Sequence, residues 1–496
     1  MKKVCSVLLT VLLMCGIVYG SIVPVGASSG TCGEGVYWSL EDGVLRIYGE
    51  GAMEEYSSSM YETRAPWAEQ RDEVYTLVVE DGVTRVGSNA FFACGNLQTA
   101  TLADSVESVG ECAFQECSEM TSMDLGSGIR RIDGGAFFGC FRLSDVEFPT
   151  GLQSIGIEAF LSCGLVSLRL PDSVAEVGAY AFAECTQLTE VSFSQAMTVI
   201  PDSCFYKCTG LRSVTVPGWI TAIESGAFAA CTQLQSVTLS EGIVSIGGAT
   251  FWDCPSLTNL SIPASVTEMN GLSNIQNLAT IELAEGSQAF RLEDGILFSK
   301  DGKCLVKYPP GRQGESYTVP DTVECIAPYA FGNTHLSSVI LPKGLRTVEE
   351  GLFMANSALR KITIPEGVTR IGTQAFAACS VLTEVTLPDS VTYIDPEAFD
   401  PNRVERIFGF AGSAAEQYAT ENNIVFETIS AEPLIPGDVN GDGSVNSSDA
   451  RLILQYTVEL AVLSDRMWAA ADMNEDSAVN STDARIVLQQ TVSIGS

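Results

Sequence analysis

A phenylalanine returns at nearly constant spacing along most of this chain, every 22 or 23 residues apart from one gap of 80. The recurring residues are Phe91, Phe114, Phe137, Phe160, Phe182, Phe205, Phe228, Phe251, Phe331, Phe353, Phe376 and Phe399. A fixed period of this length is typical of structural units that stack on one another. Each copy is too short to enclose its own apolar face, so we expect a solenoid in which neighbouring coils of about 23 residues share one core.

The pattern within one copy predicts how each coil is built. Val385 and Leu387 alternate with polar neighbours, which indicates a short strand with one buried face. Pro388 ends this strand because it has no N–H to donate. Val391 and Ile394 supply a second inward pair, and the turn that follows brings the phenylalanine into the column it shares with the neighbouring coils.

Copies such as Val368–Cys379 (Val-Thr-Arg-Ile-Gly-Thr-Gln-Ala-Phe-Ala-Ala-Cys) resemble the BspA-like leucine-rich repeats of bacterial surface antigens, and the resemblance covers roughly residues 83–410. It implies an α/β repeat fold, a leucine-rich-repeat solenoid, over residues 83–428. We expect a β-rich N-terminal cap at 28–82 and a C-terminal cap at about 405–428, because a solenoid must cover its ends.

Two further segments depart from the repeat. The gap of 80 residues contains two alternating runs around a Ser-Lys-Asp-Gly turn, which predicts a hairpin insertion at about 284–320. Residues 429–435 form a short, proline-containing linker.

The N-terminus has the pattern of an export signal. Two lysines and an apolar run to about Tyr19 precede small residues that end at Ala27. This pattern predicts a signal peptide over residues 1–27. Lipidation at Cys15 is the alternative, and the large Met14 before it argues against that reading. No other apolar run is long enough to span a bilayer, so we expect a secreted mature chain without a transmembrane segment, at the cell surface or on a scaffold.

The charge of the chain excludes one class of partner. Sixty-one acidic residues stand against 27 basic ones, two of which belong to the signal peptide, so the mature net charge is near −36. Such a surface repels nucleic acid, and we expect no nucleic-acid partner.

Nine of the sixteen cysteines lie three residues after a repeat phenylalanine. They are Cys94, Cys117, Cys140, Cys163, Cys185, Cys208, Cys231, Cys254 and Cys379. We interpret them as a buried column of free thiols, since disulfides between neighbouring coils, the alternative, would leave one unpaired. The sequence does not determine the pairing of Cys32, Cys112, Cys204, Cys304 and Cys325.

The last sixty residues carry oxygen-bearing side chains at positions 1, 3, 5, 9 and 12 of a twelve-residue loop, and the pattern recurs 34 residues later. This is the calcium-binding pattern of an EF-hand loop, in which the carbonyl of position 7 also binds the ion. The first set of expected ligands is Asp438, Asn440, Asp442, Ser444, Asn446 and Asp449, and the second is Asp472, Asn474, Asp476, Ala478, Asn480 and Asp483. We therefore expect two calcium ions. Ser477 replaces glycine at position 6 of the second loop, which predicts weaker binding there.

Each loop runs into an amphipathic helix, with no EF-hand helix before it. A duplicated calcium loop and following helix resembles the type I dockerin, and the resemblance covers residues 436–496. It implies docking to a cohesin domain of a scaffoldin, as in cellulosomes. The residues that the resemblance assigns to the cohesin contact are Ser447, Ser448, Leu454 and Gln455 in the first copy and Ser481, Thr482, Leu488 and Gln489 in the second. The alternative interpretation is that these are solvated helix-start residues with serine and threonine caps.

We find no catalytic constellation. His335 is the only histidine, and it falls at a repeat position. Repeats, caps and dockerin occupy nearly the whole chain, so we expect no enzyme, although a two-carboxylate glycosidase or another polysaccharide-degrading component remains the alternative. The outward strand positions are small, polar or acidic, which favours an unidentified protein ligand over a glycan. Trp219, Trp252, Tyr180 and Tyr206 lie in turns, where they offer an edge site for carbohydrate.

Overall fold

The structure, a computed structural model, describes most of the chain. It describes residues 28–57, 64–270, 272–429, 435–458, 460–461, 463, 465–474, 476 and 478–494. The signal peptide expected at 1–27, most of the linker expected at 429–435 and Ser477 lie outside the described residues.

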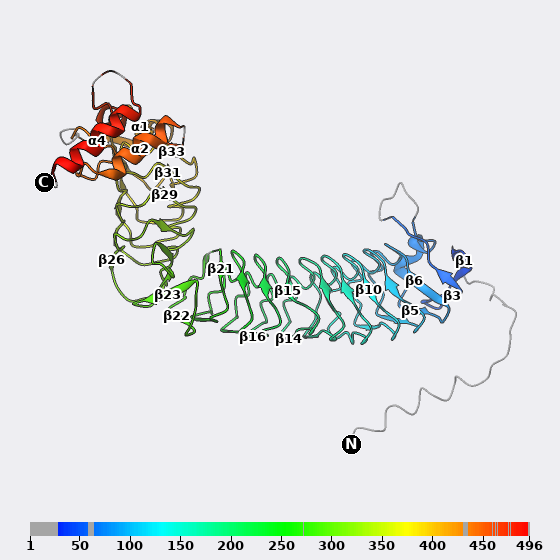
Figure 1. Cartoon of the computed structure of the whole chain (residues 1–496). Helices are drawn as coiled ribbons and strands as arrows, with labels where there is room; N and C mark the ends of the chain where they lie inside the picture. Colours follow the sequence, from blue (N-terminus) through cyan, green and yellow to red (C-terminus); the bar gives the residue numbers. More distant parts are fainter. Residues whose placement is uncertain are drawn as a thin grey trace.

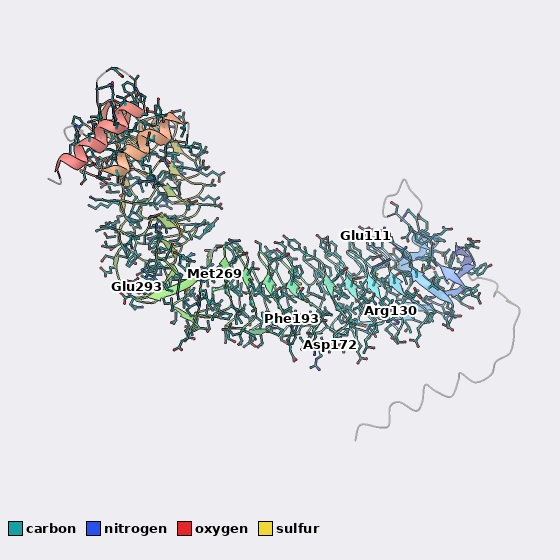
Figure 2. The ribbon with its side chains drawn as sticks, viewed as in Figure 1. Glu111, Arg130, Asp172, Phe193, Met269 and Glu293 are labelled. Carbon is teal, nitrogen blue, oxygen red and sulfur yellow. A yellow bond between two sulfur atoms is a disulfide. The ribbon has the colours of Figure 1, made fainter. Side chains whose placement is uncertain are left out.

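The repeats form a long solenoid with two straight legs that meet at an elbow, and the C-terminal helices lie at the far end of the second leg (Figure 1). Most coils contribute one strand to each of two ladders, and a turn with the phenylalanine closes the coil. Asp172 lies on the edge between the ladders, and Glu111 lies on the opposite edge (Figure 2). The predicted leucine-rich-repeat solenoid is confirmed.

The first ladder stacks parallel strands in identical register, so that Val214 faces Val237 and Thr215 faces Thr238. A repeat of constant length places like residues above one another, which gives every coil the same inward apolar side chains. The strands are β5 (Thr76–Val79), β7 (Thr99–Leu102), β9 (Ser122–Asp124), β12 (Ser167–Arg169), β14 (Glu190–Ser192), β16 (Ser213–Val216), β18 (Ser236–Leu239), β20 (Asn259–Ile262), β22 (Thr280–Leu283), β26 (Ser316–Thr318), β28 (Ser338–Ile340), β30 (Lys361–Thr363), β32 (Glu384–Thr386), β34 (Arg406–Gly409) and β35 (Val425–Thr428).

The second ladder is built from shorter strands. Each supplies an inward residue such as Ile223, which faces Ile246 of the next coil. The strands are β4 (Gly51–Ala52), β6 (Val83–Val86), β8 (Ser108–Val109), β10 (Arg131–Ile132), β11 (Ser154–Ile155), β13 (Glu176–Val177), β15 (Val199–Ile200), β17 (Ala222–Ile223), β19 (Ser245–Ile246), β21 (Glu268–Met269), β27 (Cys325–Ile326), β29 (Thr347–Val348), β31 (Arg370–Ile371) and β33 (Tyr393–Ile394).

Stacked phenylalanine rings form the centre of the core. From Phe91 to Phe251 successive ring centroids lie 5.0 to 6.1 Å apart, and the rings are nearly parallel. The second column runs from Phe331 to Phe399 with centroids 4.9 to 5.3 Å apart. Burying one such ring stabilises the fold by about 1.5–3 kcal/mol, so the column accounts for the strict sequence period.

Both ends of the solenoid are covered by aromatic side chains. At the N-terminus β1 (Ser28–Gly33), β2 (Val36–Glu41) and β3 (Val44–Gly49) form an antiparallel sheet, and β3 pairs in parallel with β5. Trp67, just before the short helix η1 (Ala68–Glu73), stacks on Phe91 with centroids 5.4 Å apart. At the other end Tyr418 of α1 (Ala414–Glu421) meets the ring of Phe399 edge-on at 5.7 Å. These aromatic rings keep the exposed ends of the column out of water.

The thiols of the repeat form a column beside the phenylalanine rings. The Sγ atoms of eight of the nine cysteines, all except Cys94, donate to the main-chain carbonyl of the phenylalanine one coil earlier, at 3.1 to 3.3 Å. All nine repeat cysteines are free and buried, as the sequence predicts. Where the repeat changes, Thr334 donates to the carbonyl of Phe331 and Asn356 donates to the hydroxyl of Thr334. The residues at this position are therefore all small and able to donate a hydrogen bond.

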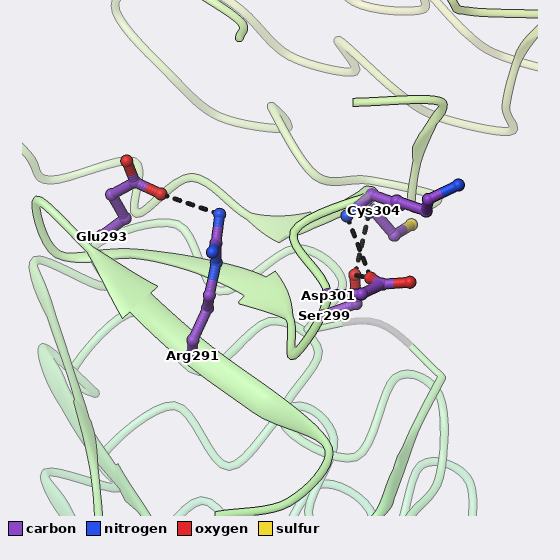
Figure 3. A network of polar contacts seen from close by, with 6 residues as sticks. Arg291, Glu293, Ser299, Asp301 and Cys304 are labelled. Atoms are coloured by element: carbon purple, nitrogen blue, oxygen red, sulfur yellow. Dashed lines mark hydrogen bonds and ion pairs between the residues drawn. The ribbon is translucent and has the colours of Figure 1, made fainter. Parts of the chain in front are cut away.

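The elbow coincides with the gap in the phenylalanine period. There β23 (Phe290–Glu293), β24 (Ile296–Ser299) and β25 (Cys304–Lys307) form antiparallel pairs, and β25 pairs in parallel with β27. Arg291 pairs with Glu293 along β23, while Ser299 and Asp301 hold the β24–β25 turn (Figure 3). The side chain of Tyr308 begins the second aromatic column at 5.5 Å from Phe331. The insertion thus ends one column and starts the next.

The cysteines outside the repeat position include one disulfide pair. Cys304 and Cys325 form a disulfide that joins β25 to β27, the pair left open in the sequence. Cys32, Cys112 and Cys204 are free. Within the described ranges, no helix is both long and apolar enough to cross a membrane.

Candidate functional site: the C-terminal calcium loops

The first loop is folded around its own carboxylates. Both oxygens of Asp438 accept main-chain N–H groups, from Asp442 at 3.0 Å and from Gly443 at 2.8 Å. Both oxygens of Asp449 also accept N–H groups, from Asn440 at 3.0 Å and from Asn446 at 2.9 Å. Hydrogen bonds of this kind curl the loop, so that oxygen side chains from distant positions face the same space.

Gly443 supplies the sharp turn that the loop requires. Its φ is +82°, and nothing lies within 4 Å of the place where a Cβ atom would stand. The residue is therefore glycine because of its left-handed backbone and not because of crowding. The loop position predicted from the sequence to turn sharply does so.

The second loop repeats these hydrogen bonds almost one for one. Asp476 N–H donates to Asp472 at 3.1 Å, and Asn480 N–H donates to Asp483 at 2.9 Å. One bond shifts by a residue: Asp483 accepts from Met473 at 3.0 Å, whereas the equivalent bond in the first loop comes from the third residue of the loop. Two loops of different sequence thus adopt nearly the same curled conformation.

Asp449 is the most perturbed carboxylate of the site. It is fully buried, and this burial is the main cause that raises the pKa of its carboxyl above the ordinary value. The two main-chain N–H donors oppose the shift, whereas the charges of Asp438 and Asp442 raise the pKa further. A buried carboxylate beside two others is a costly arrangement that a cation would relieve.

The donor set fits calcium. The oxygens of carboxylates, amides and main-chain carbonyls are the ligands that this hard cation prefers, and the first loop offers all three kinds. In the part of the chain described by the structure, no three His, Cys, Asp or Glu side chains converge closely enough to form a metal centre by themselves. Amide and carbonyl oxygens would therefore have to complete the coordination.

A helix begins at the end of each loop. Helix α2 (Ser447–Thr457) starts with a capping box, in which Asn446 accepts from Ser448 N–H and Asp449 accepts from Asn446 N–H. Helix α4 (Ser481–Ile494) starts in the same way, with Asn480 accepting from Thr482 N–H. Between them lies α3 (Asp465–Ala471). Ile453 of α2 and Val487 of α4 are buried in the small shared core.

The residues expected to contact cohesin are exposed or half-buried on α2 and α4. Ser447, Ser448 and Leu454 are exposed and Gln455 is half-buried, while Ser481, Leu488 and Gln489 are exposed and Thr482 is half-buried. Leu454 and Leu488 are exposed to nearly the same extent, at 43% and 41%. The two copies thus carry equivalent leucines at their surfaces, which an apolar core alone does not explain.

The solenoid itself offers a hollow on its first ladder. Residues 145–148 join the ladder through a single bridge, between Met123 and Val146. A hollow of about 420 Å³ opens there. It is lined by Asp145, Val146, Glu147, Phe148, Ser167 and Arg169. The repeat pattern does not predict this interruption, because the residues of the coil keep the ordinary spacing.

The fold and the site define a class: an extended repeat solenoid that ends in two helices, each preceded by a curled loop with the EF-hand ligand pattern. The model of the BspA type leucine rich repeat region matches residues 70–189, 153–278 and 312–413, and that of the dockerin type I domain matches residues 436–490. The chain belongs to the BspA-type leucine-rich repeat family and carries a C-terminal type I dockerin. Leucine-rich repeats and dockerins are non-catalytic kinds of domain. Both are typical of extracellular or cell-surface proteins.

Solved structures of similar proteins include several from bacteria. A leucine-rich repeat protein from Bacteroides ovatus is 20% identical, with a TM-score of 0.48 over 80% of this chain and 99% of that one. A leucine rich cell surface protein from Faecalibacterium prausnitzii is 22% identical, with a TM-score of 0.38 over 79% and 97%. The pneumococcal vaccine antigen PcpA is 18% identical, with a TM-score of 0.36 over 82% and 99%. A search of curated proteins finds no match.

Two features of the structure could not be predicted from the sequence. The hollow near Asp145 depends on a local loss of strand pairing, and the approach of the dockerin to the solenoid depends on contacts between residues about 100 positions apart. Neither leaves a local signal. The disulfide, in contrast, has a local sequence signal. Cys304 and Cys325 are separated by 21 residues, which is close to the length of one coil, and neighbouring coils lie side by side.

Proposed function

We propose that this protein is a secreted, non-catalytic binding protein that its dockerin attaches to a cohesin-bearing scaffoldin. The observation that carries this proposal is the duplication of one curled loop and helix, with matching hydrogen bonds in both copies. Two equivalent loops that each present an exposed leucine on the following helix are suited to a protein partner. The type I dockerin match supports cohesin as that partner.

Calcium is the proposed cofactor, with one ion in each loop. In the first loop Asp438, Asn440, Asp442, Asn446 and Asp449 would hold it together with the carbonyl of Ser444. In the second loop Asp472, Asn474, Asp476, Asn480 and Asp483 would do so with the carbonyl of Ala478. The bound ion neutralises the crowded carboxylates, and the helices that follow are then held in a fixed arrangement.

The solenoid is proposed to recognise a protein or a surface. Its outward strand positions are polar or acidic, for instance Thr215, Thr238 and Ser261. The hollow lined by Asp145, Glu147 and Arg169 gives this face a concave site with both signs of charge. Polar and charged residues make up the rim of protein interfaces, and Arg169 belongs to a residue type that is enriched in them.

Carbohydrate binding is the second candidate function for the solenoid. The exposed aromatic rings support it: Tyr180 and Trp252 are each 37% exposed and Trp219 is 44% exposed. Tyr180 and Tyr206 meet edge-on at 6.4 Å, and the ammonium of Lys207 lies 5.0 Å from the Tyr206 ring centre. Flat apolar surfaces beside hydrogen-bonding groups suit the faces of sugar rings.

One pair of binding experiments tests the proposal and separates the two ligand classes. The full-length protein is applied to a glycan array, and in parallel to a pull-down from surface proteins of its own environment. The proposal expects protein capture that is lost when Glu147 and Arg169 are replaced by alanine. Glycan binding that is lost on Trp252→Ala would favour the second candidate, and turnover of a polysaccharide would contradict the non-catalytic assignment.

A further inference from the structure

The dockerin of this chain is packed against the second leg of the solenoid. Two adjoining hollows, of about 430 and 580 Å³, lie between them and share Arg346, Arg451, Leu452 and Gln455 in their walls. The solenoid side is completed by residues of successive coils, among them Lys303, Glu324, Thr369 and Thr392. The hollows therefore form one continuous groove between α2 and the solenoid, which we call the interdomain groove.

The geometry of α2 directs one side of the helix into this groove. Ser448, Arg451, Leu452 and Gln455 are spaced three or four residues apart, which places them on one stripe of a helix. The opposite side, which includes Ala450 and Ile453, is buried against α4. Thus α2 lies between α4 and the solenoid.

Contacts of the first calcium loop fix this placement. The ammonium of Lys343 donates to the main-chain carbonyl of Asp442 at 3.4 Å. Gly441 approaches Glu366 so closely that a Cβ atom there would stand 3.0 Å from the Cγ atom of Glu366. A lysine and a glutamate of the solenoid thus both lie against the loop that carries Asp438 and Asp442, and the lysine supplies the charge opposite to that of the loop.

The second copy of the dockerin does not line the interdomain groove. Neither of the two hollows has Ser481, Thr482, Leu488 or Gln489 in its wall. Gln489 is exposed, whereas its equivalent in the first copy, Gln455, is half-buried. The two copies therefore match in local structure but differ in their surroundings.

The size of the groove decides what can reach the first copy. Volumes of this magnitude admit water and small molecules, whereas a protein partner needs roughly 800 Å² of free surface on each side. The solenoid faces Ser448 and Gln455 across the groove, whereas Ser447 and Leu454 are exposed beside it. We propose that the solenoid leaves too little room for a protein partner at the first copy, so that a cohesin docks in one orientation only, through Ser481, Thr482, Leu488 and Gln489. This inference rests on the proposed cohesin docking for its partner, but the blockage itself can be tested without a cohesin.

Cysteine labelling in the full-length chain tests the blockage. The variants Gln455→Cys and Gln489→Cys occupy equivalent positions, and each is treated with a small maleimide and with a maleimide attached to a large polyethylene glycol. The small reagent should label both positions readily, and the large one should label Gln489→Cys several-fold faster, with the modified site identified by mass spectrometry. Insertion of a flexible Gly/Ser segment between residues 429 and 435 should abolish the difference. Equal rates with the large reagent in the unmodified chain would overturn the proposal.

Cohesin binding provides the second test of the proposal, after cysteine labelling. With a type I cohesin as the probe, the double variant Ser481→Arg/Thr482→Arg should lose binding by about 100-fold or more in the full chain, whereas Ser447→Arg/Ser448→Arg should bind as the parent does. In the chain with the lengthened linker, either double variant alone should bind, because both copies are then free. Unchanged binding of Ser481→Arg/Thr482→Arg in the unmodified chain would refute the single orientation. If no cohesin binds any variant, the proposed partner is wrong, and the labelling result still decides whether the groove blocks the first copy.

Discussion

The Sγ atom of Cys208 donates a hydrogen bond to the main-chain carbonyl of Phe182, one coil earlier, at 3.2 Å. Because both groups are buried, the carbonyl cannot turn to water if the donor is removed. The thiol therefore links neighbouring coils and does not only fill space. In later coils threonine and asparagine also carry a side-chain donor at this position, but Thr334 donates to Phe331 of its own coil and Asn356 donates to Thr334.

Removing this donor should destabilise the solenoid. Cys208→Val keeps an apolar side chain of similar size but leaves the carbonyl of Phe182 without the thiol donor, and we expect a loss of about 1–2 kcal/mol in the free energy of unfolding. Cys208→Ser retains a donor and should lose less. Denaturant unfolding of the three proteins checks this order. Equal stability of the parent and Cys208→Val, with Cys208→Ser the least stable, would mean that the thiol acts only as an apolar filler.

Alkylation should distinguish Cys112 from the buried thiols of the repeat. Burial raises the pKa of Cys185 to about 12 and that of Cys94 to about 12, so these thiols stay protonated up to pH 10 and are also shielded from reagents. Cys112 is only half-buried and should react first. Mass spectrometry after iodoacetamide treatment at pH 8 should find Cys112 modified in the native protein and the repeat thiols modified only after denaturation. Early modification of Cys185 would contradict the buried column.

Lys307 at the elbow should make stability depend on pH. Its ammonium is fully buried, donates to the carbonyl of Tyr329 at 2.9 Å, and has its pKa lowered to about 7 by burial. The unfolded chain, with a pKa near 10.5, binds more protons than the folded chain between these two values, so this residue's contribution to stability should rise with pH from about 7 to 10.5.

The variant Lys307→Met tests this directly. It removes the buried amine and should stabilise the fold at pH 7 by on the order of 2 kcal/mol, with a smaller gain at pH 10. Thermal unfolding of both proteins across this range provides the measurement. Lys303→Met, which removes a mostly exposed lysine of the same strand region, is the control and should show no such trend. A stability gain of Lys307→Met that does not decrease as the pH rises would contradict the predicted pH dependence.

Calcium should stabilise α2 and α4 within the full chain. An ion that binds only the folded loops contributes about 2.7 kcal/mol at a free concentration 100 times its Kd, which slows hydrogen exchange by about 100-fold. Peptides covering both helices should therefore exchange faster after chelation. The variant Asp449→Ala should abolish the calcium effect on α2, whereas Asp81→Ala, an exposed carboxylate of the N-terminal cap, should not. Exchange that is indifferent to chelator would contradict a calcium-dependent dockerin.

The sequence predicts what repeats, and it does not predict how the repeats are interrupted. The period of the phenylalanines determines the coil, the ring column and the thiol position, because each depends on residues within one coil and its neighbour. The start of a new column at Tyr308 depends instead on how the β23–β25 sheet turns the chain. Similarly, the calcium-loop pattern predicts the curled loops and Gly443. No local pattern indicates that Gln455 faces Arg346 of the solenoid across a groove, because that relation depends on contacts distant in sequence.

The most direct test of the account is calorimetric titration of the full-length protein with a type I cohesin, in calcium and after chelation. We predict saturable binding with one cohesin per chain in calcium and no detectable binding after chelation, since the contact helices require the filled loops. Binding that persists in chelator, or no binding to any type I cohesin in calcium, would contradict the proposal that this dockerin attaches the solenoid to a scaffold.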